Sequence, residues 1–168
     1  NPIKIAVWIM QDSRDKRGGK LIADFCREIE NEHVHFDISD FSNETIYRCI
    51  ACDVCPTHIG PKEDYRCIIK NKSDIFCRDH AHLIEADAIL IAAYSPIDRS
   101  KVSSTYQKFI ERTRYLRRDD YAFTDRLVAP LVISEINANQ NLHIRILTSL
   151  IRHHTVLHHP LIAVEQEG

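Results

Sequence analysis

The stretch that decides the fold is "ADAILIAAYSP", residues 86–96, which is almost continuously apolar between Ala88 and Ala93. Strands of a parallel sheet are covered on both faces and are therefore apolar at successive positions, whereas a strand with one wet face alternates. The run follows the first pattern. It predicts an inner strand of a parallel sheet with helices on both faces.

Strand-like and helix-like segments alternate on both sides of this run. Strands are predicted at residues 3–10, 34–40, 126–136 and 161–165, and helices at 21–29, 73–86, 102–113 and 141–154. Ser73 or Asp74 is the expected N-terminal cap of the second helix. With right-handed crossovers, this alternation predicts one α/β domain over residues 1–168, a doubly wound five-stranded parallel sheet of order 2-1-3-4-5. Pro130 would remove a ladder hydrogen bond, so a bulge or local edge is expected there.

Composition excludes some classes of protein. The chain has 168 residues and a formal net charge of −2, with no long basic run that would indicate a nucleic-acid surface. No apolar run is long enough to span a membrane, and the N-terminus lacks the layout of a signal peptide. These features favour a reducing, cytoplasmic setting. The chain begins without Met and ends at "EQEG" with no final helix, so a trimmed product is expected and truncation at the C-terminus stays open.

The loops after the strands are where ligands bind in an open parallel sheet. The candidate loops are residues 11–20, 40–55, 95–104 and 135–141. In the first of them, free N–H groups at a helix N-terminus would suit a phosphate, although the loop matches neither GxGxxG nor the Walker pattern. A plain solvated loop is the alternative.

A resemblance to a known family supports the phosphate interpretation. The stretch "ADAILIAAYSPIDRSKVSSTYQKFIERT", residues 86–113, resembles the NAD(P)H-dependent FMN reductase family of the flavodoxin-like superfamily. The elements "EADAIL", "SPI", "VSS" and "FIERT" follow in the family's order and spacing. The segments "CIACDVC" and "CII" resemble its cysteine region, and "SRDKRGGK" stands where its phosphate loop belongs. The resemblance covers roughly residues 3–133.

This resemblance implies particular roles. The FMN phosphate would be held by Ser13, Arg14, Gly18, Gly19 and Lys20. The edge of the isoalloxazine ring would be contacted by Pro96, Ile97, Asp98, Arg99 and Ser100. Three of these depart from the family, because Asp98, Arg99 and Ser100 replace its usual aromatic residues and glycine. The flavin would carry the hydride chemistry itself, so no catalytic side chain is required.

Four of the six cysteines lie close together, at Cys49, Cys52, Cys55 and Cys67. The C-x2-C-x2-C run resembles the compact motif of the iron–sulfur flavoproteins, which would make these four the ligands of a [4Fe–4S] cluster. A zinc site that uses His58 as an alternative ligand is a second interpretation. Unligated thiols are the third. Cys26 and Cys77 are expected to be core residues.

Two basic strings remain, "RTRYLRRDDY" and "SLIRHHTVLHHP". The arginines of the first could bind the 2′-phosphate of NADPH or an acidic partner, but a helix surface salt-bridged to Asp119 and Asp120 is favoured. The histidines of the second are expected to be solvated or to lie at a subunit contact.

Two classes of function follow. The first is an FMN-dependent NAD(P)H oxidoreductase that passes electrons to a small-molecule or protein acceptor, such as a quinone, another flavin, a metal ion or a cluster. By analogy with the family it would be a homodimer or homotetramer. The second is a flavodoxin-like binding or assembly module without flavin catalysis, which Asp98, Arg99 and the glycine-poor loop at residues 135–141 favour.

Overall fold

The computed structural model describes residues 1–12, 14–55, 67–95, 101–118, 121–134 and 141–165. The strands are β1 (Ile3–Gln11), β2 (Val34–Asp40), β3 (Ala88–Ser95), β4 (Leu127–Ser134), β5 (Val156–Leu157) and β6 (Leu161–Val164). The helices are α1 (Arg17–Ile29), α2 (Ile75–Arg78), α3 (His80–Glu85), α4 (Val102–Arg112) and α5 (Leu142–Leu150), with 3-10 turns η1 (Thr113–Arg117) and η2 (Ile151–His153).

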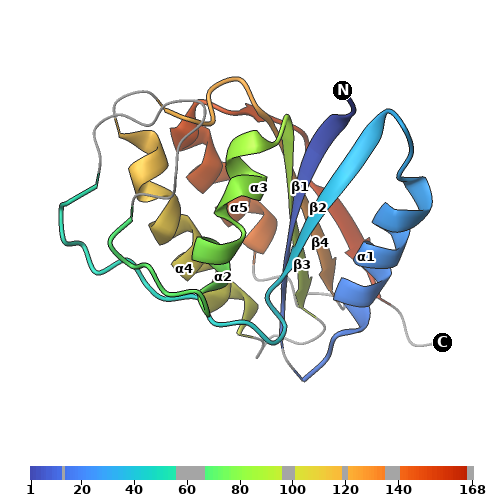
Figure 1. Cartoon of the computed structure of the whole chain (residues 1–168). Helices are drawn as coiled ribbons and strands as arrows, with labels where there is room; N and C mark the ends of the chain where they lie inside the picture. Colours follow the sequence, from blue (N-terminus) through green and yellow to red (C-terminus); the bar gives the residue numbers. More distant parts are fainter. Residues whose placement is uncertain (13, 56–66, 96–100, 119–120, 135–140, 166–168) are drawn as a thin grey trace.

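The sheet confirms the predicted α/β class and strand order. All its strand pairs are parallel, and the order is β2-β1-β3-β4-β5, with β6 also paired to β4 (Figure 1). The run that predicted an inner strand is β3, which lies between β1 and β4. Its last five residues are buried, as expected for a strand covered on both faces.

Pro130 divides the outer edge of the sheet, as the sequence predicted for a local edge. On the inner side, β4 pairs continuously with β3, with Pro130 opposite Ile91. On the outer side, β5 pairs with residues 127–128 of β4 and β6 pairs with residues 131–134. The fifth position of the sheet is therefore filled by two short strands that flank the proline.

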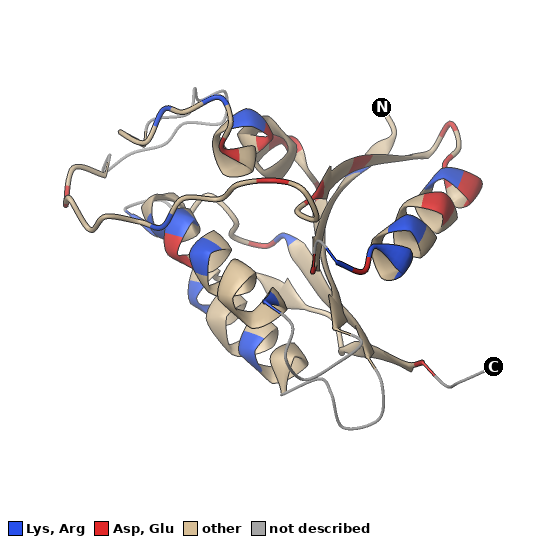
Figure 2. Ribbon diagram, turned by 90° about the horizontal axis from the view of Figure 1, so that it is seen from below, with Lys and Arg blue, Asp and Glu red and all other residues tan. Residues whose placement is uncertain are grey.

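The helices cover the two faces unequally. Among the described residues, α1 lies on one face, while α2, α3, α4 and α5 lie on the other (Figures 1 and 2). The buried side of α1 is narrower than its apolar spacing predicts. Ile22 and Cys26 are buried against the sheet, whereas Leu21, Phe25 and Ile29 are exposed. No described helix is long and apolar enough to cross a bilayer.

The single helix predicted for residues 73–86 is two short helices. α2 starts after Asp74, whose carboxylate accepts a hydrogen bond from the Phe76 amide at 3.0 Å, so Asp74 is the cap. The chain turns at Asp79, whose carboxylate accepts a 2.7 Å bond from Arg78 Nε. The Asp79 amide still donates to the Ile75 carbonyl at 2.9 Å, but its backbone angles, φ −102° and ψ 14°, leave the helical range, so α2 ends here and α3 begins after it.

The larger core lies between the sheet and α2 to α5. Trp8 is fully buried there, with its ring centroid 5.0 Å from that of Phe109 and 5.4 Å from that of Phe41. Beside this aromatic group, Arg112 is 2% exposed and forms an ion pair with the fully buried Asp74. Arg112 also donates to the Tyr47 carbonyl at 3.0 Å, which attaches the cysteine segment to α4.

Candidate functional site

The first loop joins β1 to α1 at the carboxyl edge of the sheet, beside the position where the strand order reverses. Gly18 and Gly19 allow the start of α1 to approach the strands closely. A Cβ on Gly18 would lie 2.0 Å from Tyr94 Cγ, and one on Gly19 would lie 1.8 Å from Gln11 Nε2. These two glycines therefore serve packing between helix and sheet, a role distinct from the predicted contact with a phosphate.

The Asp12 carboxylate accepts hydrogen bonds from donors of this loop. The Asp12 carboxylate accepts from the Arg14 amide at 3.0 Å and from Arg14 Nη2 at 2.8 Å. These bonds, together with one from the Lys101 amide at the start of α4, hold the pKa of Asp12 well below its usual range. Arg14 thus neutralises an acid of its own loop, although its side chain stays mostly exposed.

The same arrangement repeats further along the loop. Asp15 accepts from the Arg17 amide at 3.1 Å and pairs with Arg17 Nη2 at 2.8 Å. Arg17 also pairs with Glu165 at 2.9 Å, and Tyr94 Oη donates to that carboxylate at 2.8 Å. Burial first, and then the bond to Glu165, raise the pKa of Tyr94. Acidic groups from the loop and from the end of β6 therefore meet at this site.

Gln11 links the loop to β2. Its Nε2 donates to both carboxylate oxygens of Asp40, at 2.9 and 3.0 Å, and its Oε1 accepts from the Gly19 amide at 2.9 Å. The amides of Arg14, Arg17 and Gly19 consequently all have side-chain acceptors. In this arrangement the loop fits an FMN phosphate only if Asp12 releases Arg14, because a phosphate would otherwise meet occupied donors and nearby carboxylates.

Much of the predicted flavin site lies outside the described residues. Ser13, Pro96, Ile97, Asp98, Arg99, Ser100 and residues 135–140 lie outside the described residues. Lys20 is described and exposed on α1. The described parts of the first loop, β3 and α4 nevertheless meet at one edge of the sheet, as the strand order requires.

Three of the clustered cysteines lie within electrostatic reach of the fourth, Cys55. Burial is the main cause of a raised pKa at Cys55, and the thiols of Cys49, Cys52 and Cys67 contribute to it. Cys49 Sγ accepts a bond from the Ala51 amide at 3.4 Å, in a turn where Ala51 and Asp53 have positive φ values. Among the described residues no group of three or more His, Cys, Asp or Glu has metal-binding geometry, and His58 is outside them.

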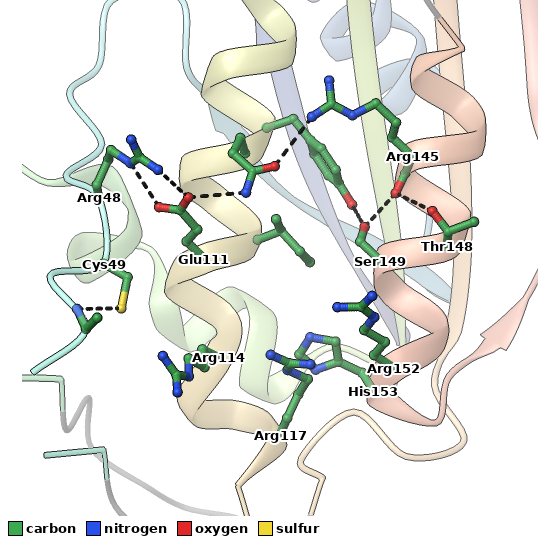
Figure 3. A pocket seen from close by; sticks show the side chains of 14 residues that line it. Arg48, Cys49, Glu111, Arg114, Arg117, Arg145, Thr148, Ser149, Arg152 and His153 are labelled. Atoms are coloured by element: carbon green, nitrogen blue, oxygen red, sulfur yellow. Dashed lines mark hydrogen bonds and ion pairs between the residues drawn. The ribbon is translucent and has the colours of Figure 1, made fainter. Parts of the chain in front are cut away.

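A second feature was not predicted from the sequence. A cleft of about 770 Å³ separates α4 and η1 from α5 and η2, with the start of the cysteine segment at its rim (Figure 3). Its lining includes five arginines, Arg48, Arg114, Arg117, Arg145 and Arg152, and one acidic residue, Glu111. The arginines come from three segments that are distant in sequence, so no local motif marks the cleft.

The cleft has a paired part and an unpaired part. Arg48 binds Glu111 through two bonds of 2.6 and 3.1 Å. Gln107 extends this chain, because it donates to Glu111 at 3.2 Å and accepts from Arg145 at 3.4 Å (Figure 3). In the unpaired part, Arg114, Arg117 and Arg152 form no ion pair with any described residue.

The two basic strings match their prediction only in part. Of the arginines expected on a salt-bridged surface, Arg112 is buried, Arg118 pairs with Asp53, and Arg114 and Arg117 line the cleft. Asp119 and Asp120 are outside the described residues. His153 was expected to be solvated or at a subunit contact, but it is 1% exposed in the chain. The adjacent His154 is exposed and stacks on Tyr121, with ring centroids 3.9 Å apart.

His153 forms part of the cleft lining and is held in one tautomer. Thr113 Oγ1 donates to the Ile110 carbonyl at 2.8 Å, so it accepts from His153 Nε2, 3.2 Å away. The Nδ1 atom then carries the lone pair, and it has no hydrogen-bond partner among the described residues. Burial, followed by the charge of Arg117, lowers the pKa of His153 to about 3.

Comparison of the chain with protein-family models finds no match, and comparison with curated proteins finds none either. Function must therefore be argued from the fold, the residues of the two sites and the resemblance in the sequence.

Proposed function

We propose that this protein is an FMN-dependent NAD(P)H oxidoreductase of the flavin- or quinone-reductase type. The observation that carries the proposal is the sheet order β2-β1-β3-β4-β5, which brings the first loop and the ends of β3 and β4 to one edge at the point where the strand order reverses. The resemblance at residues 86–113 assigns a flavin to that edge. A homo-oligomer in a reducing cytoplasm, with an electron acceptor of undefined chemistry, completes the proposal.

The chain's own residues would bind and orient the cofactor, which supplies the hydride chemistry when bound. Arg14 and Lys20 are the described cations of the first loop that would hold the phosphate. Because Arg14 is bound to Asp12, the phosphate and Asp12 would compete for the same guanidinium and amide. FMN binding would thus be weakened by a residue of the site itself.

The clustered cysteines belong to the same proposal as possible ligands of a [4Fe–4S] centre. The contribution of the other three thiols to the raised pKa of Cys55 supports their proximity to it. Iron and acid-labile sulfide determinations on anaerobically purified protein, with Cys52→Ser as the comparison, would test this part. Absence of iron in the wild-type protein would leave the flavin as the redox group.

A binding module without flavin is the second candidate. It is favoured by the occupied donors of the first loop, since Asp12, Asp15 and Gln11 satisfy the amides that a phosphate would use. In that case the Asp12–Arg14 pair would be a permanent structural contact.

FMN titration monitored by flavin fluorescence distinguishes the oxidoreductase from the binding module. Asp12→Ser should strengthen FMN binding at least about tenfold, because it frees charge-assisted donors for the phosphate. Arg14→Ala should weaken it about ten- to a hundredfold by removing one such donor. Lys16→Ala is the matched control, since Lys16 bonds to Asn43 at 2.7 Å. If neither the wild-type protein nor Asp12→Ser binds FMN, the oxidoreductase proposal is wrong and the binding module remains.

A further inference from the structure

The unpaired part of the arginine cleft concentrates positive charge. With one glutamate against five arginines, the lining carries four uncompensated positive charges. Arg117 is partly buried, and burial followed by the charges of Arg152 and Arg114 lowers its pKa. Like charges held together in this way raise the free energy of the empty cleft, and an anion from outside would lower it.

The shape of the cleft suits a small molecule. Its volume of about 770 Å³ lies within the range of small-molecule sites, roughly 300–1,000 Å³. The lining combines the buried Tyr106 and His153 with arginines that are exposed or, at Arg117, partly buried, so the cleft has a buried wall and a charged rim. A flat basic surface for a macromolecule would lack such a buried wall.

The donors define the chemistry of the ligand. Each guanidinium presents a planar fork of N–H groups that matches phosphate or carboxylate oxygens. The hydroxyls of Thr148 and Ser149 donate to backbone carbonyls, at 2.9 Å to Ile144 and 2.7 Å to Arg145, so the guanidinium groups are the main donors left for a ligand. One phosphate carries at most about two negative charges, so two are needed to balance the four uncompensated charges of the lining.

We propose that the cleft between α4, η1, α5 and η2 binds a small molecule that carries at least two phosphate groups. Arg114, Arg117 and Arg152 bind the phosphate oxygens, and the neutral ring of His153 forms the adjoining wall. This site is separate from the carboxyl-edge loop to which the flavin phosphate is assigned. Arg114, Arg117 and Arg152 lie on η1 and η2, which follow the C-terminal ends of α4 and α5, whereas the loop precedes α1.

Calorimetric titration with inorganic pyrophosphate, at low and at physiological ionic strength, tests the proposal. Arg117→Gln and Arg152→Gln should each weaken pyrophosphate binding about ten- to a hundredfold. The control Arg27→Gln removes a guanidinium that pairs with Asp24 at 2.8 Å on α1, which covers the other face of the sheet. It should leave the affinity unchanged. Thermal melts of each variant confirm that the fold is retained.

Four results would overturn the proposal. They are absence of pyrophosphate binding to the wild-type protein, equal affinity in the cleft variants, equal loss in the control, and tighter binding of citrate than of pyrophosphate. FMN titration of the same variants keeps the two sites distinct. Unchanged FMN affinity in Arg117→Gln is expected, and a parallel loss would show that the cleft and the flavin site are one.

Discussion

The first loop and the arginine cleft use the same side chain in opposite ways. In the loop, Arg14 and Arg17 are each bound to a carboxylate two residues earlier in the chain. In the cleft, Arg114, Arg117 and Arg152 face one another without a carboxylate among the described residues. The charges of the two loop arginines are therefore already paired, whereas the three cleft arginines can pair with an external anion. A basic residue at a predicted phosphate site is thus a poor guide to binding when an acid is its neighbour.

Arg112 provides the largest expected effect, because it is paired like the loop arginines but buried. Arg112→Met would leave the Asp74 carboxylate buried without its cation, at a cost of about 3–5 kcal/mol in the free energy of unfolding. Urea unfolding measures this loss. Adding Asp74→Asn should recover part of it, and Arg114→Gln, two residues away in the cleft, should cost far less. A small loss in Arg112→Met would mean that the buried pair contributes little.

Gly18→Ala tests how far packing holds the first loop in place. The added Cβ would collide with the Tyr94 ring, and overpacking of this kind costs about 1–3 kcal/mol, more than the roughly 1 kcal/mol gained in helix propensity. A lower urea midpoint is the expected result. Lys20→Ala, on the exposed side of the same helix, should stay within about 0.5 kcal/mol of the wild-type protein. Unchanged stability in Gly18→Ala would show that Tyr94 can move aside.

His153 gives the cleft a pH dependence that begins at a higher pH than that of the loop carboxylates Asp12 and Asp15. Its pKa is about 3 in the folded protein and near 6.5 when exposed, so the unfolded chain binds the extra proton between these values. Stability should therefore fall as the pH falls below 6.5, by up to about 1.4 kcal/mol per pH unit from this residue. His80, with a pKa of about 4, adds a slope of the same sign.

Denaturant unfolding between pH 4 and pH 7 should show a shallower slope in His153→Phe than in the wild-type protein. The exposed His33 offers the matched control, and His33→Phe should keep the full slope. An unchanged slope in His153→Phe would place the acid sensitivity in His80 or in the carboxylates.

The smallest expected changes in the free energy of unfolding should differ in sign between the cleft and the first loop. Arg117→Gln should raise the free energy of unfolding by a few tenths of a kcal/mol at low salt, because it relieves repulsion from Arg114 and Arg152. Arg14→Gln should lower it, since the buried Asp12 loses its cation. Salt should shrink the first change more than the second, because the repulsion among the cleft arginines is not a direct contact, whereas the buried Asp12 is bonded to Arg14 at 2.8 Å. Effects of equal sign in urea unfolding would contradict the contrast between loop and cleft.

The sequence predicts the sheet well because strand signals are local. β2 has the predicted bounds, and Pro130 lies at an edge as its missing N–H requires. The prediction misses β5, since two residues give no periodic signal. It also merges α2 and α3, because the break is a change of backbone conformation at the single residue Asp79, which apolar spacing does not record.

The candidate site was less predictable because charge pairing is a tertiary property. The stretch containing Arg112, Arg114, Arg117 and Arg118 looks uniform in sequence, yet its members are buried, open to the cleft, or paired with Asp53. Arg145 and Arg152 join them only after the chain has passed through β4. Likewise, the sequence contains Asp12 beside Arg14 but does not reveal that the carboxylate is buried against the Lys101 amide.

The division of the outer edge at Pro130 also bears on self-association. An exposed strand edge is a template on which a second molecule can add a strand, and long, flat apolar edges are the most hazardous. Ile162 and Val164 on β6 are about half exposed, at 48% and 49%, so this edge is apolar. However, β6 has four residues and β5 has two, and they flank a proline without an N–H. A second molecule therefore meets two short, separated runs, which limits aggregation through this side of the sheet.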